Sequence, residues 1–226
     1  MMVKAITLLA VFLSLSQAAL HAYVAQTSLG GVLYLVNRRY VLSQHYEPAD
    51  LVAPRVPGGD KMGTLMREEA ALALEQLFAA ALAEGHELVA SSGYRSYKKQ
   101  ATIWDNKVGQ VGQRKAQLYV APPGASEHQL GLAMDLARKS NGHLNAAFGK
   151  SEEGRWVAQN AHRFGFIVRY RADWTDITGY ADEPWHIRYV GREHAQTIVD
   201  LDIPLETYVA QLSAAAFGEY LREDGE

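Results

Sequence analysis

The 226-residue sequence contains no cysteine. This absence excludes a thiol nucleophile, a disulfide framework and a thiolate metal site, so any metal must be held by imidazole and carboxylate groups. The chain also has little excess charge, with a formal net charge of -3 at pH 7 and no stripe of lysine and arginine. Nucleic acid and anionic membrane surfaces are therefore not expected as partners. Internal repeats are absent as well, and the length and ordinary composition favour one globular domain.

Long apolar runs are scarce, but one lies at the N-terminus. Residues 5–15 are almost all apolar, follow Lys4 and precede the small residues Ser16 and Ala18. This pattern is typical of a secretory signal peptide, and the run is too short to span a bilayer comfortably. We therefore expect residues 1–22 to be a signal peptide and the protein to be exported to the periplasm, cell envelope or extracellular space. A buried N-terminal helix or strand and a weak membrane anchor are the alternatives.

The rest of the sequence mixes helical and strand patterns. Apolar residues at helical spacing, with capping and stop residues, predict helices over residues 66–83, from about 96, from 151 to 164, over 193–199 and over 205–212. Apolar runs bounded by turn residues predict strands over 87–90, 131–137, 166–170 and 185–190. Because helices and strands do not alternate regularly, the predicted class is α+β. We expect one domain over residues 23–215 and a polar tail over 216–226.

Two short segments, about fifty residues apart, carry most of the chemical information. The first, SEHQLGLAMDLA, contains His128 and Asp135, and the second, EPWH, begins at Glu183 and ends at His186. Two histidines and an aspartate are three ligands of the kind that zinc takes, which leaves a fourth position open. The glutamate is a carboxylate that could move protons beside the ion. The sequence therefore predicts a catalytic zinc centre.

His128 and Asp135 cannot share one straight helix or strand if both bind the same ion. Seven helical residues rise by about 10 Å, whereas ligands lie about 2 Å from a zinc ion. On a strand, an odd spacing points the two side chains to opposite faces. The chain must therefore turn between them, and Gly131 is the natural pivot. Ala133 and Ala137 flank Asp135 and leave room for an ion and a substrate.

The other histidines lack such a setting. A lone histidine is usually a surface residue or a hydrogen-bonded core residue. We expect this ordinary role for His21, His45, His86, His143, His162 and His194.

These motifs resemble those of the VanY-type D-alanyl-D-alanine carboxypeptidases and the related L,D-carboxypeptidases of the LdcB and DacB type. The family pattern S-x-H-x-x-G-x-A-x-D, followed by E-x-W-H, is matched without departure. The matching residues are Ser126, His128, Gly131, Ala133, Asp135, Glu183, Trp185 and His186. SGYRS, residues 92–96, is a third family motif, with Gln100 at the expected place after it. The similarity extends from about Leu35 to Leu212.

The resemblance implies a fold and a role for the motif residues. The fold is a small central antiparallel sheet with flanking helices and a zinc site in a cleft on the sheet. His128, Asp135 and His186 would bind zinc, and Glu183 would act as general base and general acid. Arg95 would bind the substrate and stabilise charge on the tetrahedral intermediate. A planar guanidinium suits this task because it can hold a terminal carboxylate through two parallel hydrogen bonds, although a structural ion pair is the alternative.

Three other residues are expected near the substrate, namely Ser126, Gln100 and Tyr94. Ser126 and Gln100 are neutral partners for the substrate, or residues that hold the loop. Tyr94 is a wall of the pocket or a core residue.

The sequence therefore predicts an exported, monomeric, zinc-dependent hydrolase that removes a C-terminal D-alanine from the peptide stems of bacterial peptidoglycan. Both D,D and L,D specificity stay open, because specificity depends on loops such as residues 108–123 and 171–182. One alternative is an endopeptidase that cuts inside the stem or a cross-link. Another is a zinc-containing protein of the same fold that binds cell-wall peptides without cutting them, although Glu183 argues against it because a pure binder needs no base.

Overall fold

The structure, a computed structural model, describes residues 24–59, 63–140, 142 and 144–223. These residues form two compact units, one comprising the described residues up to Leu35 and from Leu205 onward, and the other running from Val36 to Pro204. The unit from Val36 to Pro204 contains both sheets and every predicted site residue. The predicted signal peptide over residues 1–22 lies outside the described residues. Within the described ranges, none of the helices has the length and apolar character needed to cross a membrane.

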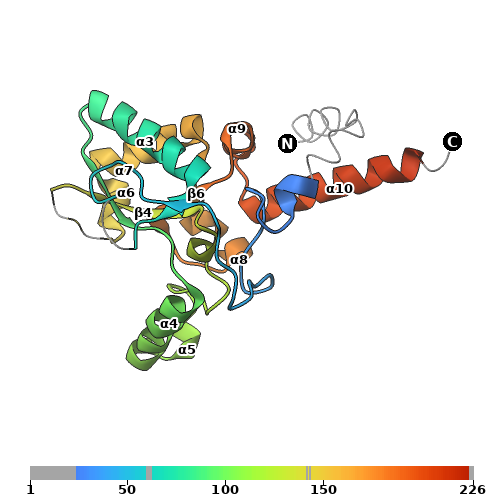
Figure 1. Cartoon of the computed structure of the whole chain (residues 1–226), viewed down its shortest axis with the longest axis horizontal. Helices are drawn as coiled ribbons and strands as arrows, with labels where there is room; N and C mark the ends of the chain where they lie inside the picture. Colours follow the sequence, from blue (N-terminus) through green and yellow to red (C-terminus); the bar gives the residue numbers. More distant parts are fainter. Residues whose placement is uncertain (1–23, 60–62, 141, 143, 224–226) are drawn as a thin grey trace. The chain divides into compact units, whose positions relative to one another are not determined.

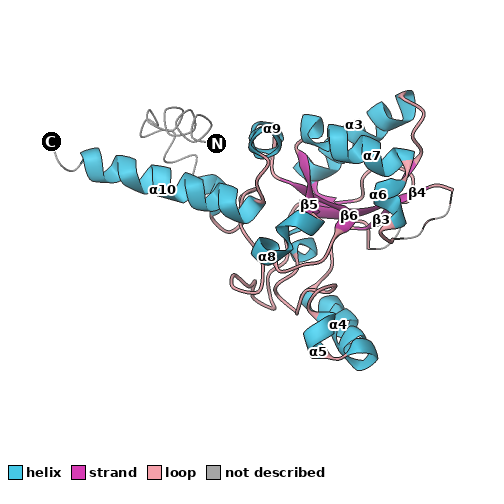
Figure 2. Ribbon diagram, turned by 180° about the vertical axis from the view of Figure 1, so that it is seen from behind, coloured by secondary structure: helices cyan, strands magenta, loops and turns pink. Residues whose placement is uncertain are grey.

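A four-stranded antiparallel sheet forms the centre of the larger unit (Figure 1, Figure 2). Its order is β3-β4-β6-β5, with β3 over Leu88–Ser92, β4 over Ala133–Arg138, β6 over Glu183–Tyr189 and β5 over Phe166–Tyr170. A second, two-stranded sheet pairs β1, Leu51–Val52, with β2, Met66–Arg67. The predicted α+β class with a small central antiparallel sheet is confirmed.

Strand β4 lies inside the sheet because its sequence is apolar on both faces. Met134 and Leu136 are fully buried, and the alternate residues Ala133 and Ala137 are buried as well. A strand covered on both faces reads as a near-continuous apolar run. Asp135 is the single acidic residue in this run, so a charged group is placed in the interior of the molecule.

Besides a short helical segment over residues 24–27, the described part of the chain contains eight α-helices and three short 3-10 helices. The α-helices are α3 (Glu68–Ala83), α4 (Tyr97–Val111), α5 (Gln113–Ala116), α6 (Ala147–Lys150), α7 (Glu152–Asn160), α8 (Thr175–Thr178), α9 (Arg192–Leu201) and α10 (Leu205–Glu223). The 3-10 helices are η1 (Glu127–Leu130), η2 (Ala161–Phe164) and η3 (Ala172–Trp174). The predicted N-cap of α7 is confirmed, since the Ser151 hydroxyl accepts a hydrogen bond from the Gly154 amide at 3.0 Å.

Several element boundaries differ from the sequence prediction, among them the following three. Helix α3 begins at Glu68 rather than at residue 66, because Met66 and Arg67 pair with β1. Strand β6 begins at Glu183 rather than at residue 185, because Glu183 pairs with Tyr170 of β5 beyond an irregularity in the register. Helix α10 continues to Glu223 rather than ending at residue 212.

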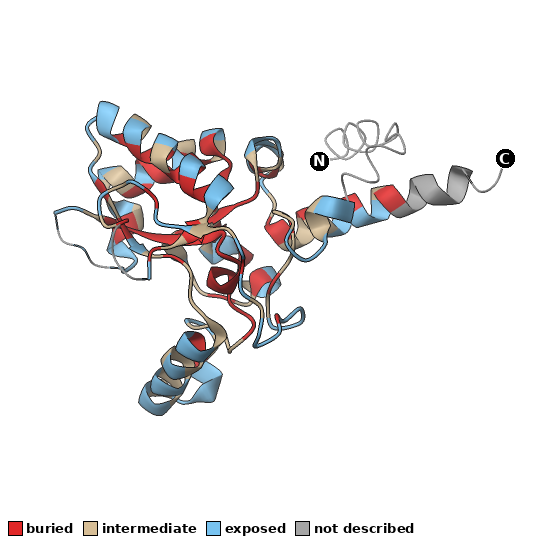
Figure 3. Cartoon of the chain, in the orientation of Figure 1, coloured by how far each residue is buried: buried red, intermediate tan, exposed pale blue. Residues whose placement is uncertain are grey.

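The helices differ strongly in how far they are buried (Figure 3). Helix α3 buries a face of seven residues, which are Ala70, Ala71, Ala73, Leu74, Leu77, Phe78 and Ala81. Helix α4 buries only Gln100, although the Ser96 side chain caps it by accepting from the Lys99 amide. Helices α4 and α5 therefore project from the body of this unit (Figure 1), and the one buried side chain of α4 is polar.

The predicted turn between His128 and Asp135 lies at Gly131. This glycine ends η1 in the left-handed region, with φ of 68° and ψ of 17°. A Cβ at this position would lie 2.8 Å from Leu51 Cδ2 and 3.1 Å from Arg67 Cγ. Both the backbone conformation and the close neighbours therefore require glycine.

We expect Gly131→Ala to destabilise the protein by more than the cost of left-handed backbone alone, which is about 1–2 kcal/mol. The control is Gly85→Ala, because Gly85 also has a positive φ, of 86°, but an added Cβ would meet nothing within 4 Å. Chemical denaturation followed by circular dichroism measures both free energies of unfolding. Equal losses for the two variants would show that the contacts with Leu51 and Arg67 do not matter.

Candidate metal centre and active site

Three different elements bring the predicted metal ligands together. His128 lies on η1, Asp135 on β4 and His186 on β6. Asp135 and His186 are direct partners in the β4–β6 register, so their side chains leave the sheet side by side. The turn at Gly131 returns the η1 segment over the same strand. One ligand atom from each of the three residues lies within 4.8 Å of the others, and all three residues are buried.

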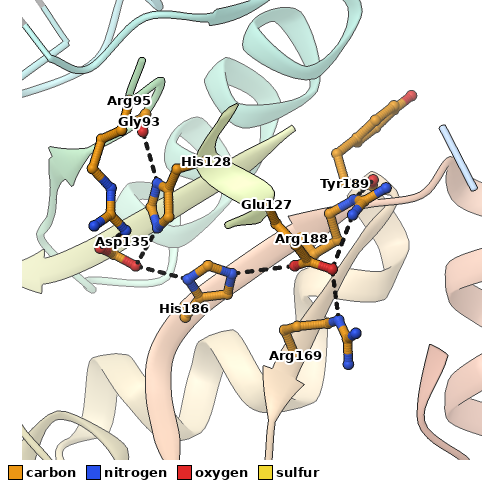
Figure 4. Close-up of polar contacts among 9 residues, drawn as sticks. All are labelled: Gly93, Arg95, Glu127, His128, Asp135, Arg169, His186, Arg188 and Tyr189. Atoms are coloured by element: carbon orange, nitrogen blue, oxygen red, sulfur yellow. Dashed lines mark hydrogen bonds and ion pairs between the residues drawn. The ribbon is translucent and has the colours of Figure 1, made fainter. Parts of the chain in front are cut away.

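The Asp135 carboxylate stands between the two imidazole rings (Figure 4). Its Oδ1 lies 3.0 Å from His186 Nδ1 and 3.4 Å from His128 Nε2. On the far side of the first ring, His128 Nδ1 lies 2.7 Å from the carbonyl oxygen of Gly93. A carbonyl can only accept, so Nδ1 carries the hydrogen and His128 Nε2 keeps its lone pair.

This arrangement fits a metal ion. His128 Nε2 is buried and has no hydrogen-bond partner, so a lone pair of nitrogen faces a carboxylate oxygen that also has only lone pairs to offer. Buried polar atoms without partners are rare in folded proteins. A cation bound between His128, Asp135 and His186 would satisfy all three, and imidazole and carboxylate are ligands that zinc takes.

The electrostatics of the three ligands also suit a cation. Burial, reinforced by the positive charge of Arg95, lowers the pKa of His128 to about 4, so this ring is neutral at pH 7. Although burial opposes ionisation, His128 and His186 hold the pKa of Asp135 well below its usual range. Burial likewise opposes the charging of His186, yet Asp135 and Glu127 raise its pKa to about 9. Asp135 and Glu127 together stabilise a proton on His186, and the same two negative charges would stabilise a metal cation bound beside that ring.

Glu183 lies at the start of β6 and lines the same cavity as the two histidines. Burial raises its pKa to about 7; the negative charge of Asp135 adds to this rise, whereas His186 and Arg95 oppose it. A carboxyl group with a pKa near neutrality can both accept and return a proton. Perturbed groups of this kind gather at functional sites.

Arg95 reaches the cavity from the loop after β3. Its backbone amide donates to the His128 carbonyl at 3.1 Å, which ties this loop to η1. The guanidinium lies 4.0 Å from Asp135, measured from Nη2 to Oδ2, and its buried Nε has no hydrogen-bond partner. Because the contact with Asp135 is long, the guanidinium retains donors for a bound anion.

The cavity contains most of the residues that the sequence singled out. Arg95, Gln100, Ser126 and Glu183 line it together with the two histidines. Gln100 donates through Nε2 to the Ala121 carbonyl at 2.7 Å, whereas its buried Oε1 has no partner. Tyr94 is half-buried, and it is not among the described residues that line this cavity.

Six residues that line the cavity were not candidate site residues: residues 119–121 and Tyr180, which lie in the loops expected to set specificity, and Glu127 and Tyr170. The rings of Tyr170 and Tyr180 contact each other, with centroids 4.7 Å apart, and the Tyr170 ring also lies 4.9 Å from that of His186. The buried Tyr180 hydroxyl has no partner, and burial raises the pKa of this group to about 12. Neither tyrosine stands in the zinc motifs, and only the sheet register brings Tyr170 beside Glu183.

Comparison with known proteins agrees with this geometry. The family model described as VanY: D-alanyl-D-alanine carboxypeptidase matches residues 63–192. YodJ of Bacillus subtilis (strain 168), which is named as a carboxypeptidase, is 51% identical over 181 residues, covering 78% of this chain and 66% of YodJ. A D-alanyl-D-alanine carboxypeptidase of Enterococcus faecalis (strain ATCC 700802 / V583) is 38% identical over 78% of this chain and 65% of its own length. This chain therefore spans slightly under two thirds of both relatives.

Solved structures with the same fold include enzymes of both specificities. The LdcB LD-carboxypeptidase has a TM-score of 0.76 and 50% identity, covering 80% of this chain and 87% of that one. VanYB in complex with D-Alanine-D-Alanine has a TM-score of 0.69 and 37% identity, covering 79% and 97% of the two chains. A VanY D,D-pentapeptidase in complex with Zn(II) has a TM-score of 0.68 and 37% identity, covering 79% and 98%. By its sequence motifs, its fold and the family model that it matches, the chain belongs to the VanY D-alanyl-D-alanine carboxypeptidase family.

Proposed function

We propose that this protein is a zinc-dependent carboxypeptidase that removes a C-terminal D-alanine from peptidoglycan stem peptides. The observation that carries the proposal is the convergence of His128, Asp135 and His186 beside a cavity that Glu183 and Arg95 line. Related structures hold Zn(II) and D-Alanine-D-Alanine, which supports both the metal and the class of substrate.

Zinc would be held by His128 Nε2, an oxygen of Asp135 and a ring nitrogen of His186. When bound, it supplies a Lewis acid that makes a water molecule more acidic and polarises the substrate carbonyl. Glu183 accepts the proton of the attacking water and passes it to the amine that leaves. With a pKa near 7, Glu183 is suited to both transfers.

Arg95 binds the C-terminal carboxylate of the substrate. A carboxypeptidase must recognise a terminal carboxylate, and the guanidinium presents planar, paired donors that match such a group. Its Nε is buried without a partner, so binding of an oxyanion would satisfy it. Gln100 Oε1 and the Tyr180 hydroxyl are also buried without partners, and they suit the amide and amine groups of a peptide.

The site of action that we propose is the cell wall outside the cytoplasm. The pattern of residues 1–22 is that of an export signal, and the peptide stems of the proposed substrate are part of the wall. Both D,D and L,D cleavage are compatible with the site, because solved relatives include a VanY bound to D-Alanine-D-Alanine and an LD-carboxypeptidase.

The proposed activity is tested by mass spectrometry of defined tetrapeptide and pentapeptide stems incubated with zinc-loaded protein. We expect one of them to lose a single alanine, and we expect this loss to stop when zinc is removed by a chelator and to return when zinc is added. Loss from the pentapeptide alone indicates D,D specificity, and loss from the tetrapeptide alone indicates L,D specificity. Internal cleavage would indicate an endopeptidase, and two intact peptides with zinc bound would indicate a binding protein.

Removing the base should separate metal binding from turnover. Glu183→Gln is expected to lower kcat by at least about 100-fold, because general base catalysis is lost, while one zinc per chain is retained. Zinc content by elemental analysis and turnover are measured on the same sample. Glu87→Gln, which changes an exposed acid outside the cavity, serves as the control. Full activity in Glu183→Gln would rule out the proposed proton transfer.

The role of Arg95 is tested by changing both partners of the proposed contact. Arg95→Lys keeps a positive charge but loses the paired donors, so we expect kcat/KM to fall by about 10–100-fold, from the usual strength of hydrogen bonds to charged groups. A substrate with a C-terminal carboxamide should already be poor for the wild-type enzyme and should lose little more in the variant. If the variant slowed both substrates equally, Arg95 would not be reading the carboxylate.

A further inference from the structure

A cluster of three buried charges lies behind the metal centre. Glu127 on η1, Arg169 on β5 and Arg188 on β6 are each at most 1% exposed. Glu127 Oε1 accepts from Arg169 Nε at 2.8 Å and from Arg188 Nη1 at 2.9 Å (Figure 4). Removing charges from water is costly even when they are paired. Apolar side chains of similar volume could fill the same space. The contacts of the cluster with the metal ligands therefore point to a role beyond packing.

The second oxygen of Glu127 points at a metal ligand. Oε2 lies 3.4 Å from His186 Nε2, on the side of the ring opposite Asp135. With two guanidinium groups on its other oxygen, the Glu127 carboxylate is ionised and can only accept hydrogen bonds. His186 Nε2 therefore carries a hydrogen, and Nδ1 is the ring nitrogen that lies toward Asp135 and is placed to bind the metal.

The two histidines are thus oriented by the same device. The outer nitrogen of each ring meets an acceptor, which is the Gly93 carbonyl for His128 and the Glu127 carboxylate for His186. The inner nitrogens, His128 Nε2 and His186 Nδ1, both face Asp135 Oδ1. Partners of this kind fix the tautomer and the orientation of metal-binding histidines in other proteins.

We propose that Glu127 is a positioning residue that holds His186 with Nδ1 facing the metal, and that Arg169 and Arg188 hold Glu127 in place. The inference rests on the proposed zinc centre and adds the residues that orient it. Because η1, β5 and β6 each contribute one charge, the cluster also joins the turn that carries His128 to the strand that carries His186.

The variant Glu127→Gln tests this role without changing the size of the side chain. Because Arg169 and Arg188 are hydrogen-bond donors, they favour the orientation in which the glutamine amide oxygen faces them. The amide NH₂ group then faces His186 Nε2. Two donors then oppose each other, which favours the tautomer whose hydrogen is on Nδ1 and removes the lone pair from the metal centre. We expect the dissociation constant for zinc to rise by about 10–100-fold, measured on metal-free protein by competition with a chromophoric chelator.

The matched control is Glu75→Gln, which breaks the carboxylate–guanidinium pair of Glu75 and Arg55 at the surface. It should leave zinc affinity unchanged. Thermal unfolding with and without zinc gives the rise in melting temperature that zinc causes, and a purely structural role of Glu127 would not change this rise. In Glu127→Gln we expect the rise in melting temperature on zinc addition to shrink, whereas a structural role would lower both melting temperatures equally.

Loss of a buried carboxylate opposite two arginines could prevent folding, so the wild-type protein provides a second measurement. Nitrogen-15 NMR of the zinc-loaded protein should show hydrogen on Nε2 of His186 and on Nδ1 of His128. Hydrogen on Nδ1 of His186, or unchanged zinc affinity in folded Glu127→Gln, would overturn the proposed role of Glu127. Absence of zinc binding by the wild-type protein would instead overturn the proposed function itself.

Discussion

The structure depends on one unfavourable juxtaposition, in which two imidazole nitrogens approach the same buried carboxylate oxygen. Asp135 Oδ1 lies 3.0 Å from His186 Nδ1 and 3.4 Å from His128 Nε2. Although burial opposes the charging of His186, the carboxylates of Asp135 and Glu127 raise its pKa to about 9. The surrounding fold holds this geometry through the β4–β6 register, the left-handed Gly131 and the contacts on the outer sides of both rings. The positions of the three ligands are therefore fixed by contacts of the protein itself.

The same constraint explains how charge is distributed around the cavity. Arg95 lies against the carboxylate of the ligand Asp135, whereas Arg169 and Arg188 lie against the carboxylate of Glu127 behind His186. Burial raises the pKa of Glu183 to about 7, although the positive charges of His186 and Arg95 oppose this rise. Carboxyl groups in one site thus acquire different tasks: Asp135 stays ionised as a ligand, while Glu183 can exchange a proton. Divergent environments for neighbouring acids are the usual way in which such roles are divided.

Much of the site could be predicted from the sequence because its ligands stand in two short motifs. The spacing of His128 and Asp135 alone required a turn, and the structure has that turn at Gly131. The strand and helix types were correct for the long periodic segments, whereas the starts of α3 and β6 were misplaced because strand pairing overrode local pattern. Tyr170, Tyr180 and the cluster around Glu127 could not be predicted. Their positions depend on contacts across 42 or 61 residues, as in Glu127 with Arg169 and Arg188, and no local signal encodes that register.

The most direct test of the central claim is anomalous X-ray diffraction at the zinc edge from crystals of the zinc-loaded protein. The account predicts one peak per chain, at about 2.0–2.2 Å from His128 Nε2, an oxygen of Asp135 and His186 Nδ1. Glu183 should lie near this peak without binding it as closely as the three ligands do. A peak elsewhere, or none between these residues at full zinc occupancy of the protein, would contradict the account.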